Sequence, residues 1–112
     1  MKIYHNPRCR KSREGVKYLS DKGIEFKIIE YLKNEISEKK MKSLLTKLNI
    51  SPIDLIRKNE IFWKKNYKTK DLSEKQIIKL LCNHPILMER PIIETEYKAV
   101  IGRPKENIDN LI

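Results

Sequence analysis

The fold of this chain is decided by residues 2–30, which read KIYHNPRCRKSREGVKYLSDKGIEFKIIE. Residues 2–5 mix apolar and polar side chains in a pattern typical of a short strand. Residues 12–21 carry apolar side chains at helical spacing, and Gly23 ends that helix. Residues 25–30 again have the composition of a strand. A strand, a helix and a strand in this order predict parallel pairing and an α/β fold.

The rest of the chain predicts a run of helices, then two strands and a last helix. Ser37 and the Ser51-Pro52 pair are typical helix starts, and Ser73 with Gln76 resembles a capping box. We expect helices over 37–48, 51–59, 73–84 and 104–111, and strands over 91–94 and 98–101. This order predicts one domain over residues 1–112. Its mixed four-stranded sheet is built from a βαβ and a ββα unit, with a helical insertion between them.

Composition predicts a folded cytoplasmic protein. Of the 112 residues, 39% are hydrophobic and 36% charged, and the apolar positions recur along the whole chain. No apolar run approaches the ~20 residues of a membrane span, and the N-terminus lacks the apolar stretch of a secretion signal. We therefore expect no membrane partner. We also expect a monomer. In a reducing compartment its cysteines are more often catalytic than bridged.

The net charge of +10 does not by itself indicate a nucleic-acid partner. Its lysines are scattered, without the dense basic stripe and interleaved aromatic residues of a nucleic-acid surface. We therefore expect no specific nucleic-acid binding. The few arginines are arranged differently, because three surround Cys9 and the others are Arg57, Arg90 and Arg103. Positions that keep arginine in a lysine-rich chain indicate a need for its planar, bidentate fork.

Cys9 is the candidate nucleophile, because it lies between the first strand and the first helix. Backbone N–H groups and the helix dipole favour an anion at such a position, and Arg8, Arg10, Lys11 and Arg13 add positive charge nearby. Both effects stabilise a thiolate over a thiol. The motif is C-x-x-S, and its Ser12 can hydrogen-bond the thiolate. Serine cannot resolve a mixed disulfide, and any redox cycle therefore needs a thiol from elsewhere.

A zinc site is the alternative use of these side chains. His5, Cys9, Cys82 and His84 have suitable ligand atoms, but their spacing matches no standard zinc motif. His84 before Pro85 also ends a helix. We expect no metal, and Cys82 as a residue on a helix face.

The segment Tyr4-His5-Asn6-Pro7-Arg8-Cys9, followed by Ser12-Arg13, resembles the active-site segment of the glutaredoxin-dependent arsenate reductase family. Four more blocks follow in the order and with the gaps of that family. They are Leu55-Ile56-Arg57-Lys58-Asn59, His84-Pro85-Ile86-Leu87, Arg90-Pro91-Ile92-Ile93 and Gly102-Arg103-Pro104. Five blocks in register across nearly the whole chain are far more specific than one.

The resemblance implies a thioredoxin-like fold with a helical insertion and assigns roles within the site. Cys9 is the implied nucleophile, with His5 influencing its state and Asn6 shaping the loop. The three arginines Arg57, Arg90 and Arg103 are the implied ligands of the oxyanion. Pro91 is the implied cis-proline beside the site.

The implied activity is reduction of arsenate, or a similar small oxyanion, through a thiol–arsenate adduct on Cys9. Glutathione is the implied co-substrate and glutaredoxin the implied protein partner, with no bound cofactor. Two alternatives remain. One is an Spx-like transcription regulator that binds RNA polymerase, against which Ser12 and Arg103 argue, because such proteins usually carry C-x-x-C and lack the Arg-Pro pair. The other is a glutathione-dependent thiol reductase of the same fold without arsenate activity.

Overall fold

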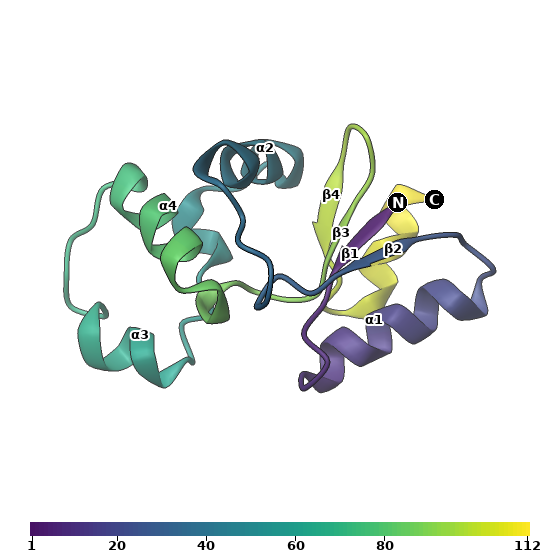
Figure 1. Cartoon of the computed structure of the whole chain (residues 1–112), viewed down its shortest axis with the longest axis horizontal. Coiled ribbons are helices and arrows are strands. Elements are labelled where there is room, and N and C mark those ends of the chain that lie inside the picture. The colour runs from purple at the N-terminus through teal and green to yellow at the C-terminus, as the bar shows by residue number, and fades with distance from the viewer. The chain divides into compact units, whose positions relative to one another are not determined.

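The computed structural model describes all of residues 1–112 and divides the chain into two compact units. The sheet unit consists of Met1–Asn34 and Arg90–Ile112, and the helical unit is Glu35–Glu89 (Figure 1). The single domain over residues 1–112 stays a prediction. No helix is long and apolar enough to cross a membrane.

The sheet unit contains a mixed four-stranded sheet in the order β2-β1-β3-β4. Strand β1 is parallel to β2, and β3 is antiparallel to both β1 and β4. This confirms the predicted mixed sheet, its βαβ unit and its β-hairpin. The strands are β1 (Lys2–Tyr4), β2 (Lys27–Ile29), β3 (Ile92–Glu94) and β4 (Ala99–Ile101), with α1 (Arg10–Asp21) between β1 and β2 and the 3-10 helix η3 (Lys105–Leu111) after β4.

The core of the sheet unit lies between one face of the sheet and two helices. Ile3 and Ile93 are register partners on β1 and β3, so their side chains share a face. Leu19 of α1 and Ile108 of η3 pack against them, and all four are fully buried. Burying such a side chain contributes about 1.5–3 kcal/mol each, which holds α1 and η3 on the sheet.

The helical unit is built from α2 (Glu38–Leu48), η1 (Pro52–Leu55), α3 (Ile61–Asn66), α4 (Glu74–Asn83) and η2 (Pro85–Leu87). Two of its helix starts have the predicted caps. Ser37 Oγ accepts the N–H of Lys40 at 3.1 Å, and Ser73 forms the capping box with Gln76. Both caps are local in the sequence, so residue type was enough to predict them.

Three helices differ from the sequence-based prediction. The helix expected over 51–59 is only the 3-10 turn η1, because Ile56 becomes extended and forms a β-bridge with Met88. The helix α3 was not predicted. The last helix is present, but η3 is a 3-10 rather than an α-helix.

Candidate active site

A hydrogen-bonded turn over residues 6–9 presents Cys9 at the start of α1. The Cys9 N–H donates to the Asn6 carbonyl at 3.0 Å, and the Arg8 N–H donates to Asn6 Oδ1 at 3.0 Å. Pro7 occupies the second position, where its fixed φ suits a turn. Cys9 is the N-cap residue of α1, so its side chain lies at the positive end of the helix dipole, as predicted.

Ser12 holds this loop rather than the thiol. Its fully buried Oγ accepts the Asn6 N–H at 2.9 Å and lies 2.6 Å from His5 Nδ1. The expected hydrogen bond between Ser12 and the Cys9 sulfur is therefore wrong. Side chains of a first helical turn tilt back toward the N-terminus, which directs this hydroxyl to the loop backbone. Ser12 thus ties the end of β1 to the start of α1.

His5 is buried in the same network, and this burial favours the neutral imidazole. Burial lowers the pKa of His5 below its ordinary value of 6.5, and the positive charge of Arg13 lowers it further. The carboxylate of Glu30 and the bond to Ser12 act in the opposite direction but are weaker than the burial. The predicted influence of His5 on Cys9 stays a prediction. The contact that the structure provides for it is indirect, through Ser12 and the loop.

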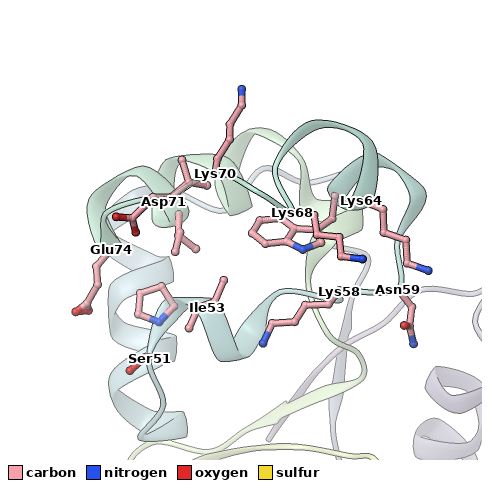
Figure 2. A pocket seen from close by; sticks show the side chains of 13 residues that line it. Ser51, Ile53, Lys58, Asn59, Lys64, Lys68, Lys70, Asp71 and Glu74 are labelled. Atoms are coloured by element: carbon pink, nitrogen blue, oxygen red, sulfur yellow. The ribbon is translucent and has the colours of Figure 1, made fainter.

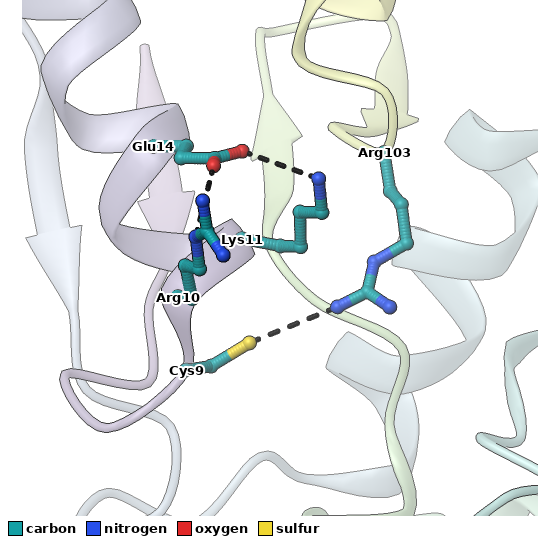
Figure 3. A network of polar contacts seen from close by, with 5 residues as sticks. All are labelled: Cys9, Arg10, Lys11, Glu14 and Arg103. Atoms are coloured by element: carbon teal, nitrogen blue, oxygen red, sulfur yellow. Dashed lines mark hydrogen bonds and ion pairs between the residues drawn. The ribbon is translucent and has the colours of Figure 1, made fainter.

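Arg103 lies at the Cys9 sulfur (Figure 3). Its Nη2 donates to Cys9 Sγ at 3.7 Å, a contact between residues that lie far apart in the chain. Asn107 Nδ2 donates to the carbonyls of Ile101 and Arg103, at 3.0 and 3.3 Å, and so fixes the turn that carries the guanidinium. The buried Nε of Arg103 has no hydrogen-bond partner. The guanidinium therefore keeps donor capacity beside the nucleophile.

The basic residues that follow Cys9 are partly neutralised by a carboxylate that sequence reasoning missed. Glu14 lies 3.6 Å from Arg10 and 3.5 Å from Lys11, one helical turn further along α1 (Figure 3). Arg13 donates to the Pro7 carbonyl at 2.9 Å. Arg103, rather than these neighbours in sequence, is the cation in contact with the sulfur.

Pro91 is packed between two glycines, and its peptide bond with Arg90 is cis, as the resemblance implies. A Cβ on Gly15 would lie 2.9 Å from Pro91 Cγ, and one on Gly102 would lie 3.1 Å from it. The Gly102 N–H donates to the Pro91 carbonyl at 2.8 Å. Both glycines are therefore needed for close approach, and Gly102 sets the position of Arg103. A glycine inside a helix, where it is normally unfavourable, was the available signal for Gly15. The Arg103-Pro104 bond is also cis, which was not predicted.

The other two arginines expected at the oxyanion lie in different units. Arg90 belongs to the sheet unit, directly before Pro91, and is only 5% exposed. A buried guanidinium needs acceptors or an anion to compensate its charge. Arg57 belongs to the helical unit, where its N–H donates to the Leu87 carbonyl at 2.7 Å and its Nη1 lies 3.8 Å from Glu60. The role of both in oxyanion binding stays a prediction.

Cys82 lies on α4 in the helical unit and is half-buried. Burial raises the pKa of the Cys82 thiol, and Glu38 raises it further. Both effects favour the protonated, less nucleophilic form. The structure contains no group of three or more His, Cys, Asp or Glu side chains that could hold a metal ion.

The comparison with known proteins agrees with this arrangement. The sequence profile of the ArsC family matches residues 4–111. The chain belongs to the ArsC family. It is 40% identical to "Arsenate reductase" of Haemophilus influenzae, over 95% of this chain and 93% of that protein. It is 39% identical to the "Uncharacterized protein YfgD" of Escherichia coli K12, over 100% of this chain and 96% of that protein.

Solved structures of the ArsC family share the whole fold. "Arsenate reductase from Vibrio cholerae" superposes with a TM-score of 0.92 at 34% identity, and covers 100% of this chain and 98% of that one. Together with the observed sheet order, this confirms the predicted thioredoxin-like fold with a helical insertion.

Proposed function

We propose that this ArsC family member is an arsenate reductase in which Cys9 attacks arsenic. The observation that carries the proposal is the contact between Arg103 Nη2 and Cys9 Sγ at 3.7 Å. Arsenate is a tetrahedral anion and repels a thiolate. A guanidinium beside the sulfur offsets that repulsion and offers parallel donors to two oxygens of the anion.

The first step forms one bond and breaks another. The Cys9 sulfur bonds to arsenic, and one arsenate oxygen leaves as water after taking up protons. We assign Arg103, which contacts the sulfur, the role of donor to the remaining oxygens, and we assign a second fork to buried Arg90 of the same unit. We assign Arg57 the third fork, as the family resemblance implies.

Reduction needs an external thiol, because Ser12 has no redox chemistry and its hydroxyl is already bonded to His5 and Asn6. We assign this role to glutathione, and the completion of the cycle to glutaredoxin. In the balanced reaction, arsenate and two thiols give arsenite, one disulfide and water. Arsenic gains two electrons, and the two thiols lose them.

The test is arsenate-dependent oxidation of NADPH by the purified protein with glutathione, glutaredoxin and glutathione reductase. We expect turnover by the native protein and by Cys82→Ser, and none by Cys9→Ser. Cys82→Ser is the matched control, because it removes the other thiol. Turnover without arsenate would indicate a general thiol reductase. If the protein reduces no arsenate with any reductant, the proposal is wrong and the regulator alternative is supported.

A further inference from the structure

The helical unit contains a cavity of about 740 Å³ that the proposed reaction does not use. Its wall is formed by residues of η1, α3, α4 and the segments between them (Figure 2). This volume is within the roughly 300–1,000 Å³ of typical small-molecule sites. All of its lining residues belong to the helical unit, so the cavity is complete within that unit.

The floor of the cavity is apolar. Pro52, Trp63 and Ile77 are buried, and Ile53 and Leu72 are half-buried. Together they place an aromatic ring and aliphatic groups from three separate elements on the surface that a bound ligand would contact. Such a surface gains free energy by covering an apolar body of comparable size.

The charges on the rim are separated by sign. Lys64 and Lys68 extend on the side of the cavity where Asn59 lies, and the Lys58 side chain runs from that side toward Ile53. Asp71 and Glu74 lie on the opposite side (Figure 2). The fourth lysine is different, because the Lys70 ammonium points away and lies 5.4 Å from the centre of the Tyr67 ring.

Lys58, Lys64 and Lys68 form no ion pair within the protein, unlike Lys11, Lys17 and Lys33 elsewhere. Three ammonium groups that line one opening without an ion-pair partner create a positive potential there. An anionic group bound at this opening compensates that charge. The carboxylates of Asp71 and Glu74 repel an anionic group from the opposite side of the cavity.

We propose that this cavity binds an organic anion, with its acidic group among Lys58, Lys64 and Lys68 and its apolar body against Trp63 and Ile53. The chemistry requires both parts of the ligand. A bare inorganic ion leaves the floor uncovered, and a neutral apolar molecule leaves the lysines uncompensated. The site is independent of the arsenate chemistry at Cys9.

The experiment uses the full chain and follows the indole N–H signal of Trp63 in a ¹H–¹⁵N spectrum. The chain has a single tryptophan, so this signal is unique and reports from the cavity wall. The probes are octanoate, inorganic phosphate as the charge alone, and 1-octanol as the apolar body alone. We expect saturable shifts with octanoate and binding at least about tenfold weaker with either control, because each loses one of the two contributions.

A pair of matched variants tests the position of the anionic group. Lys58→Gln/Lys68→Gln should weaken octanoate binding about tenfold, since charge-assisted contacts are lost. Lys75→Gln/Lys79→Gln removes the same charge from exposed positions that do not line the cavity, and should leave the affinity within about twofold. Equal loss in both variants would overturn the proposal in favour of a general charge effect. Equal binding of phosphate, equal binding of 1-octanol, or no shift with octanoate would each overturn it as well.

Discussion

Replacing Arg103 with lysine separates the geometry of the guanidinium from its charge. In the native protein the Gly102 N–H and the Asn107 amide fix the turn around Arg103, and Nη2 reaches Cys9 Sγ at 3.7 Å. Lysine keeps one positive charge but has neither the planar fork nor the second in-plane donor. The variant therefore retains electrostatic support of the thiolate and loses bidentate contact with the oxyanion.

The expected cost follows from the donors that are lost. One hydrogen bond to a charged group contributes about 1.5–3 kcal/mol. At 1.36 kcal/mol per factor of ten, Arg103→Lys should lower kcat/KM for arsenate by about 10- to 150-fold. The alkylation rate of Cys9 by iodoacetamide should change by no more than about threefold, since the charge beside the sulfur is kept.

The assay is arsenate turnover at saturating glutathione and glutaredoxin, with alkylation measured on the same samples by mass spectrometry. Asn107→Ala is the control for position, because it loosens the turn and leaves the guanidinium intact. We expect a smaller loss in that variant. Native turnover in Arg103→Lys would refute the assignment of Arg103 as an oxyanion ligand. An equal fall in turnover and alkylation would show that Arg103 acts on the thiol alone.

Four further predictions rest on the packing and the titratable groups. Gly102→Ala should lower the free energy of unfolding by about 1–3 kcal/mol, measured in urea, because the new Cβ would lie 2.7 Å from a buried isoleucine. Ser12→Ala should lower the free energy of unfolding by about 1–3 kcal/mol, because it leaves the buried Asn6 N–H and His5 Nδ1 without their hydrogen-bond partner. Because burial lowers the pKa of His5, folding favours the neutral ring. The unfolding free energy should therefore be retained above about pH 6.5 and fall below it, with a smaller fall in His5→Asn. Alkylation at mildly acidic pH should label Cys9 before Cys82, whose pKa burial raises; faster labelling of Cys82 would contradict this.

The parts of the fold that local chemistry controls could be predicted from the sequence. Ser37 and Ser73 act within their own first turns, so their caps were visible in residue type and spacing. The helix α3 was not visible, because its N-cap residue Glu60 makes no side-chain cap and the burial of Trp63 holds it in place. The early end of η1 depends on the bridge from Ile56 to a distant strand-like segment, which no local pattern shows.

The candidate site divides in the same way. Cys9 at a helix start is a local feature, and the sequence indicated it. Its contact with Arg103 crosses most of the chain, and only the family resemblance pointed to it. The direction of the Ser12 hydroxyl was predicted wrongly, because it depends on the tilt of one side chain and on the buried partner that His5 offers. Asn107 had no recognisable motif, since its function is to hold a backbone turn.

The most direct test of the account is whether arsenic becomes bonded to Cys9 during reduction. The measurement is intact-protein and peptide mass spectrometry of the Cys82→Ser variant incubated with arsenate and glutathione, without glutaredoxin to complete the cycle. We predict an arsenic-containing adduct with glutathione that maps to the peptide with Cys9, requires arsenate and is absent from Cys9→Ser. Arsenate turnover by the Cys9→Ser protein, or no arsenic on Cys9 in a variant that reduces arsenate, would contradict the account.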